Sequence, residues 1–191
     1  SSSAASDVYK RQALNRAIQA AVNPPGEGKP ERRFGESIFR EGDRVMQVRN
    51  NYDVMWREKN GLSSGMGVFN GDIGRVETVD NRSETITVDF EGRVVEYTPD
   101  MLGELESAYA ITVHKAQGSE YRCVVLAAMP AAPSLMVRGV LYTALTRARE
   151  LLIVVGDDAA IRAMAENDRQ QRRYSGLRWR MAHSALPPET V

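Results

Sequence analysis

The sequence predicts an α/β chain in which a small antiparallel β-barrel precedes a parallel strand–helix–strand unit. Apolar and polar residues alternate through much of the stretch 39–106, which is the period of strands with one buried face. After residue 109 the pattern changes to continuous apolar runs at 123–128 and 151–155. Such runs are typical of parallel strands that are buried on both faces.

The N-terminal region contributes one short predicted helix. Residues 1–12 carry little that could pack, and we expect them to be a leader that is not native to the protein. The spacing in 14–22 predicts a helix, and the Pro- and Gly-rich stretch 23–30 ends it. Its expected apolar face consists of Leu14, Ala17, Ile18 and Ala21.

The β-rich stretch contains four or five short strands, which predict a small barrel. First strands are expected at 45–48 and 73–79, with Gly74 as a bulge candidate, and a polar, Gly-rich loop at 56–67. A two-residue turn at 91–92 predicts a hairpin with a defined register. In that register Phe90 faces Arg93, Val88 faces Val95, and Ile86 faces Tyr97.

The C-terminal unit follows from helical and strand periodicities. A helix between the two apolar runs has its apolar face at Val137, Val140, Leu141, Ala144 and Leu145. A last helix is expected from the Asp157-Asp158 pair to about Glu166, with an aspartate as N-cap. Cys123 lies within an apolar run and is expected to be a buried structural thiol.

Composition narrows the possible partners. The 191 residues have 42% hydrophobic content, a formal net charge of zero and a single cysteine. Zero net charge predicts that nucleic acid could bind only at a local patch, and the lone cysteine suits a cytoplasmic protein. We expect no membrane span and no metal site, because two histidines and one cysteine offer no ligand spacing.

Hydrogen-bonding side chains gather directly after the apolar pair 110–111. They are Thr112, His114, Lys115, Gln117 and Ser119. Gly118 would let a ligand approach the backbone closely. Donors at the carboxyl end of a strand predict contacts with phosphate or sugar groups; the alternative is a polar loop that binds nothing.

Two arginines end the predicted second helix. Arg147 is expected at the edge of the apolar stripe, where its planar guanidinium could reach a phosphate; the alternative is an ordinary surface arginine. Arg149 is expected further round, where it would favour the helix dipole. The chain has no Gly-x-x-x-x-Gly-Lys-Ser/Thr loop and therefore no motif that would cradle the first two phosphates of a nucleotide.

Residues 109–121 (YAITVHKAQGSEY) and 142–149 (YTALTRAR) resemble motifs V and VI of superfamily-1 helicases, most closely the RecD-like, 5′→3′ branch. Shorter matches in the same order extend the resemblance over about residues 14–177. They lie at 14–15, 23–25, 39–46, 49–53 and 68–74.

The resemblance implies a fold and a domain organisation. Residues 13–38 and 107–180 would form the C-terminal part of a second RecA-like, P-loop NTPase motor domain. Residues 39–106 would be an inserted SH3-like barrel, and 181–191 a tail. The chain would then be a fragment that lacks the N-terminal motor domain of the same polypeptide.

The resemblance also implies roles for individual residues in an ATP-dependent DNA helicase. Arg147 would be the arginine finger, and Gly118 and Glu120 would lie on the nucleotide side. ATP and Mg²⁺ would be the cofactors, with Mg²⁺ held by the missing domain, and the fragment alone would be inactive. The residues expected to face single-stranded DNA are Thr112, His114, Lys115, Gln117 and Ser119.

Two other interpretations stay open at this point. The helicase half of a conjugative relaxase shares these motifs. A stand-alone, non-enzymatic module that binds nucleic acid or a partner through the barrel belongs to another class. Sequence upstream of this chain would separate the relaxase from the helicase. A phosphate-binding loop in frame there would favour a helicase over the stand-alone module, and a native start near residue 13 would favour the module.

Overall fold

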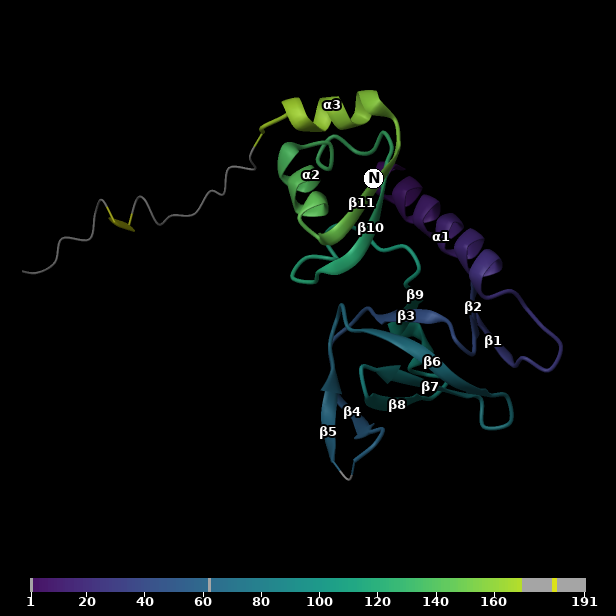
Figure 1. The fold of residues 1–191 in the computed structure, drawn as a ribbon. Helices are drawn as coiled ribbons and strands as arrows, with labels where there is room; N and C mark the ends of the chain where they lie inside the picture. The colour runs from purple at the N-terminus through teal and green to yellow at the C-terminus, as the bar shows by residue number, and fades with distance from the viewer. Residues whose placement is uncertain (1, 62, 170–179, 182–191) are drawn as a thin grey trace, which may run out of the picture.

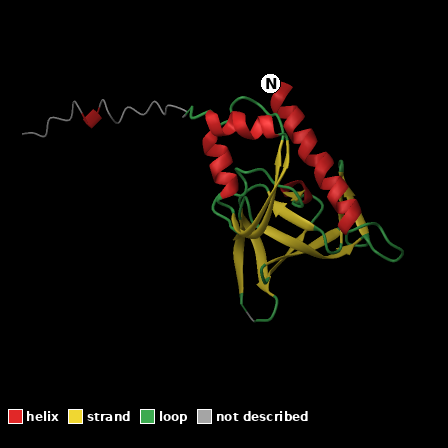
Figure 2. Cartoon of the chain, turned by 45° about the horizontal axis from the view of Figure 1, so that its top comes forward, coloured by secondary structure: helices red, strands yellow, loops and turns green. Residues whose placement is uncertain are grey.

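The computed structural model describes residues 2–61, 63–169 and 180–181. Most of the arginine-rich stretch 168–180 and the predicted tail 182–191 lie outside the described residues. The helices lie towards one end of the molecule and the antiparallel strands towards the other (Figure 2). Helix α1 runs alongside the C-terminal α/β unit and leads down to the β-rich unit (Figure 1).

Helix α1 (Ser2–Val22) is longer than predicted and buries a different face. Asn15, Gln19 and Asn23 repeat every four residues and are buried, whereas Leu14 is 39% exposed. The expected apolar face is therefore wrong, because α1 lies against polar backbone and a carboxylate, not against an apolar core. The helix includes residues 2–12, and Arg11 pairs with Glu106 at 2.8 Å; the non-native origin of this stretch stays a prediction.

The β-rich unit confirms the antiparallel prediction for the stretch 39–106. Its seven-stranded sheet has the order β5-β4-β8-β7-β6-β3-β9, and every neighbouring pair is antiparallel. One apolar core holds it together, with Phe39, Ile86 and Val88 fully buried. The strands are β3 (Arg44–Gln47), β4 (Asn51–Glu58), β5 (Ser64–Val68), β6 (Ile73–Asp80), β7 (Thr85–Phe90), β8 (Arg93–Tyr97) and β9 (Leu105–Ser107).

The β7–β8 hairpin has the predicted register. Phe90 pairs with Arg93, and Ile86 pairs with Tyr97. Glu91 and Gly92 both have positive φ, 53° and 93°, as a two-residue turn of the primed type requires. The turn therefore sets which side chains enter the core.

Two parts of the β-rich unit differ from the predictions. The stretch 56–67 is largely a β4–β5 hairpin and not a loop. A β-carbon at Gly65 would lie 2.4 Å from the Trp56 ring, so this glycine makes room for the indole between paired strands. In addition, β1 (Glu31–Phe34) and β2 (Ser37–Arg40) form a separate hairpin upstream of the barrel.

The C-terminal unit confirms the predicted parallel strand–helix–strand arrangement. It comprises β10 (Tyr121–Ala128), α2 (Arg138–Leu145), β11 (Ala148–Gly156) and α3 (Asp158–Glu166). The two strands pair in parallel, with Val125 opposite Ile153. Asp157 caps α3 as predicted, because its carboxylate accepts a hydrogen bond of 2.8 Å from the amide of Ala159.

The strands β10 and β11 are not buried on both faces, contrary to the prediction. Val125 is 63% exposed, Leu151 52% and Val155 56%, and the Cys123 thiol is exposed instead of buried. The physical reason is that this sheet has only two strands among the described residues, so no further layer covers it. Parallel sheets normally have both faces covered.

None of the described helices combines the length and the apolar character that crossing a bilayer requires.

Gly74 gives a test of the barrel packing. It is not the bulge, which lies between Val76 and Thr78; a β-carbon at Gly74 would lie 2.7 Å from Cγ1 of Val88 and 2.8 Å from the carbonyl oxygen of Asp89. We expect Gly74→Ala to lower the free energy of unfolding in urea by about 1–3 kcal/mol. Gly139→Ala, which meets no atom within 4 Å on helix α2, should raise it by up to about 1 kcal/mol. Equal stabilities of the two variants would contradict this packing.

Candidate functional site

The two stretches singled out in the sequence lie side by side. The loop 112–120 enters β10 at Tyr121, whose amide donates a hydrogen bond of 2.8 Å to the carbonyl oxygen of Arg147. Arg147 lies in the short connection between α2 and β11. The parallel pairing of β10 with β11 thus brings residues that are about 30 positions apart onto one surface.

The loop 112–120 forms successive turns and displays its polar side chains. The amides of Ala116, Gln117 and Ser119 donate hydrogen bonds to the carbonyl oxygens of Thr112, His114 and Ala116, at 3.0, 3.3 and 3.1 Å. Within the loop, the side chain of Ala116 is buried. The exposed predicted site residues are Thr112, His114, Gln117, Gly118, Ser119 and Glu120.

Gly118 has a φ of +89° with open space around its α-carbon. That conformation favours glycine over residues with a β-carbon. The backbone is therefore open at this point, and the approach of a ligand there stays a prediction.

Lys115 differs from the other predicted contact residues. Its Nζ lies 3.8 Å from Oε2 of Glu106, and its side chain is only 30% exposed. The same carboxylate oxygen lies 2.8 Å from the guanidinium of Arg11. Lys115 therefore points towards α1 and β9, and not in the direction of the exposed loop side chains.

The loop separates two hollows in the surface. His114 and Gln117 line a groove together with Arg138, Tyr142 and Thr143 of α2. On the other side, a cleft contains Ser119, Glu120 and Tyr121. The barrel residues that line this cleft include Arg44, Asp72, Arg75 and Arg93.

Arg147 is held against the loop by its guanidinium. Helix α2 ends at Leu145, so Arg147 follows the helix and is not on its apolar edge as expected. Its Nη1 donates to the carbonyl oxygen of Ser119 at 2.8 Å, and its Nε donates to that of Thr143 at 3.1 Å. The structure therefore brings Arg147 directly to the predicted contact loop.

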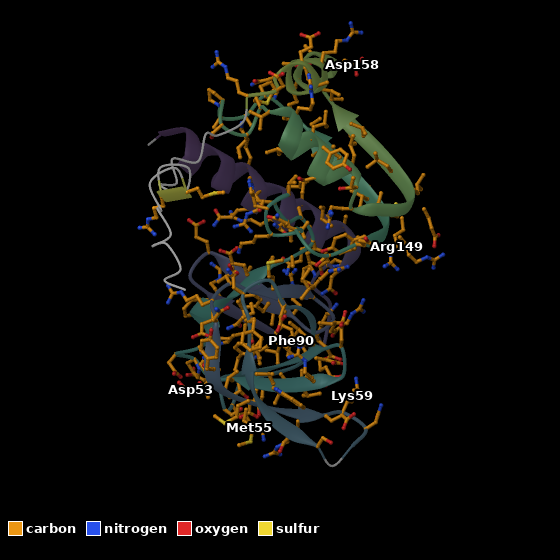
Figure 3. The ribbon with its side chains drawn as sticks, turned by 90° about the vertical axis from the view of Figure 1, so that its left-hand side faces the viewer. Asp53, Met55, Lys59, Phe90, Arg149 and Asp158 are labelled. Carbon is orange, nitrogen blue, oxygen red and sulfur yellow. The ribbon has the colours of Figure 1, made fainter. Side chains whose placement is uncertain are left out.

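Arg149 lies in strand β11 and not at a helix C-terminus, so the expected interaction with the helix dipole is wrong. Its Nε donates to Oε2 of Glu120 at 2.6 Å. Figure 3 shows Arg149 at the surface, near the junction between the α/β unit and the barrel. The helix ends early because the chain must extend from Ala148 onward to pair with β10.

The residues that hold the start of the loop were not predicted from the sequence. Asn15 of α1 forms two hydrogen bonds with the backbone of Ala110, one to its carbonyl oxygen at 2.8 Å and one from its amide at 2.9 Å. Tyr109 donates to Asp43 at 2.8 Å. The only available signal was the regular spacing of amides in 15–23, which an apolar-face analysis disregards.

Within the described ranges, no group of three histidine, cysteine, aspartate or glutamate side chains could hold a metal ion.

Two family models match this chain in the order of its two units. The ATP-dependent RecD-like DNA helicase SH3 domain matches residues 14–90. The UvrD-like helicase C-terminal domain matches residues 107–155, which include the loop, α2 and most of β11. The chain belongs to the RecD-like helicase family. An SH3-like domain therefore precedes a helicase C-terminal domain that contains the parallel strands.

Curated relatives of this RecD-like chain are much longer than it is. The ATP-dependent RecD2 DNA helicase of Deinococcus radiodurans is 37% identical over 170 residues, which is 89% of this chain and 21% of the relative. The RecBCD enzyme subunit RecD of Mycobacterium tuberculosis is 35% identical over 117 residues, 61% of this chain and 20% of that protein. An uncharacterized protein of Methanocaldococcus jannaschii is 34% identical over 126 residues, 61% of this chain and 11% of that protein.

The contacts of Arg147 predict a measurable contribution to stability. Arg147→Ala removes hydrogen bonds to Ser119 and Thr143 and should lower the free energy of unfolding by about 1–2 kcal/mol. Arg149→Ala breaks an ion pair whose side chains are 67% and 48% exposed, and should cost less than about 1 kcal/mol. Urea denaturation of both variants tests this, and a larger loss for Arg149→Ala would contradict the assigned contacts.

Proposed function

We propose that this chain supplies the C-terminal part of the second RecA-like motor domain of an ATP-dependent, RecD-like DNA helicase, with the SH3-like barrel as an insert. The observation that carries the proposal is the contact between Arg147 and the loop 112–120. In this proposal the loop lies within motif V (109–121), and the α2–β11 connection lies within motif VI (142–149). The direct bond from guanidinium to loop carbonyl lets a change at one motif reach the other.

The two hollows beside the loop support a division of roles. His114 and Gln117 in the groove with α2, together with Thr112, would contact the phosphate and sugar groups of single-stranded DNA. Ser119 also belongs to the proposed DNA-contacting set, although it lines the opposite cleft with Glu120. Lys115 would join the set only after leaving Glu106, because the carboxylate now holds it.

The part of the loop that Arg147 contacts, at the carbonyl oxygen of Ser119, suits a nucleotide in part. Arg147 supplies the cation that a terminal phosphate requires, and Gly118 and Glu120 lie beside it in the loop. ATP would supply the phosphoryl group whose release drives movement along DNA. The described residues hold no cluster suited to Mg²⁺, so we assign its ligands to the preceding motor domain.

The uncovered apolar faces of β10 and β11 support the assignment to a larger domain. Val125, Ile153 and Val155 project apolar surface that no described element covers. Further strands and helices of a RecA-like domain, preceded by the first motor domain, would bury it. The length of the relatives, of which this chain spans about a fifth or less, agrees with this proposal.

The chain by itself is expected to lack ATPase activity. Its sequence has no loop of the type that cradles nucleotide phosphates. Phosphate release should stay at background with and without oligothymidine. A DNA-stimulated rate in a preparation free of contaminating ATPases would refute the assignment to an incomplete motor.

In a longer RecD-like protein that contains this chain, Arg147→Ala should lower ATP turnover by about 10³-fold, the scale known for arginine fingers. Binding of single-stranded DNA should change much less, because the contact between Arg147 and the terminal phosphate of ATP develops in the transition state of hydrolysis. Arg147→Lys should not restore turnover, since an ammonium lacks the planar fork.

Arg149→Ala serves as the matched control for Arg147→Ala. It removes a neighbouring guanidinium whose partner Glu120 is also exposed, and we expect a loss of turnover of less than about tenfold. Steady-state ATPase assays over a DNA titration decide which of the two arginines is the finger. If Arg147→Ala kept normal turnover and Arg149→Ala were inactive, the assignment of the arginine finger to Arg147 would be wrong.

A further inference from the structure

The carboxylate of Asp43 lies in the tight turn between β2 and β3 and is 1% exposed. Four donors surround it. Gln19 Nε2 and the amide of Arg40 donate to Oδ2 at 2.5 and 2.8 Å. Asn23 Nδ2 and the hydroxyl of Tyr109 donate to Oδ1 at 2.5 and 2.8 Å.

These donors come from segments that are distant in the sequence. Gln19 and Asn23 belong to α1 and its end, and Arg40 ends β2. Tyr109 lies three residues before the loop 112–120. A single side chain of the barrel therefore joins the N-terminal helix, its own turn and the start of the predicted contact loop.

The backbone on either side of Tyr109 is also held. The amide of Ala108 donates to the carbonyl oxygen of Arg44 at 2.8 Å, and Asn15 bonds both backbone groups of Ala110. Tyr109 is thus fixed at its hydroxyl and at both neighbours. Any displacement of the β2–β3 turn must move the point where the loop begins.

Among the described residues, the groups that donate to the Asp43 carboxylate are all neutral. The nearby cations have other partners: Arg40 donates to Glu31 and to the carbonyl oxygen of Asn23, and Lys29 contacts the side-chain oxygen of Asn23. Burial, followed by the bond to Asp43, raises the pKa of Tyr109 to about 12. The phenol therefore stays protonated at neutral pH and remains a donor.

We propose that Asp43 is a positioning residue, which sets the location of the loop 112–120 relative to the SH3-like barrel through its bond with Tyr109. A buried carboxylate that accepts four bonds has no low-energy alternative arrangement, so the barrel and the start of the loop move as one body. Movement of the barrel would then alter the surface that the loop presents. The consequence for DNA rests on the proposed function; the positional coupling does not.

Tyr109→Phe tests the coupling with the smallest change, because it removes one donor and keeps the ring. Hydrogen–deuterium exchange of the intact chain should rise by about 3- to 10-fold at the amides of Ala116, Gln117 and Ser119, the range expected for one lost hydrogen bond. Exchange in the hairpin 85–97 should stay within about twofold of the wild type.

Tyr97→Phe is the matched control. The Tyr97 hydroxyl donates to Gln47 at 2.8 Å inside the barrel. Tyr97→Phe therefore also removes one hydrogen bond from a tyrosine hydroxyl and keeps the ring. It should leave exchange in 112–119 unchanged. If Tyr109→Phe and Tyr97→Phe give the same exchange in that loop, the positioning role is overturned.

Asp43→Asn extends the test. An amide offers one acceptor oxygen and places an NH₂ group against two donors, so loop exchange should exceed that of Tyr109→Phe. If this variant fails to fold, the comparison of the two tyrosine variants still decides.

A DNA-binding measurement separates this inference from the proposed function. Fluorescence anisotropy with labelled oligothymidine should give a Kd at least about threefold higher for Tyr109→Phe than for Tyr97→Phe. A change in exchange without any DNA binding by the wild-type chain would uphold the positioning role and refute the proposed DNA contact. Unchanged exchange with normal DNA binding would refute the positioning role alone.

Discussion

A carboxylate that is removed from water must be surrounded by hydrogen-bond donors, and this requirement at Asp43 organises the junction between the two units. Its donors include the side-chain amides of Gln19 in α1 and of Asn23 just after it, and the hydroxyl of Tyr109. Because an unsatisfied buried charge is costly, each donor must stay where it is. The helix therefore turns its polar stripe inward, and the chain enters the loop 112–120 from a fixed point.

The two units differ in how completely they bury their apolar side chains. The seven-stranded sheet of the barrel packs around one core in which Phe39, Ile86 and Val95 are fully buried. The α/β unit has two parallel strands whose apolar side chains remain largely exposed. The barrel thus buries its own apolar side chains, whereas the apolar strand faces of the α/β unit are not covered by the described residues. In the proposed function, the rest of a larger motor domain would cover them.

The two arginines beside the loop differ in the groups that surround their charge. Arg147 is bound to carbonyl oxygens of Ser119 and Thr143, neutral acceptors that leave its positive charge uncompensated. Arg149 is paired with the carboxylate of Glu120, which neutralises it. An anionic ligand would therefore be attracted more strongly to Arg147, which supports Arg147 and not Arg149 as the proposed phosphate contact.

The sequence by itself determined the elements whose signals are local. The alternation in 85–97 and its two-residue turn set the hairpin register, the aspartate before α3 set its cap, and the two apolar runs set the parallel strands. Motif resemblance identified the family.

The tertiary structure alone decided what depends on neighbours distant in the chain. The amides of α1 became its buried face because Asp43 and Ala110 lie opposite, and residues 56–67 paired because Gly65 admits the Trp56 ring. Lys115 pairs with Glu106, Arg149 lies in a strand, and Cys123 is exposed. The sequence could not predict these placements, because a periodic pattern does not reveal which neighbouring layers are present.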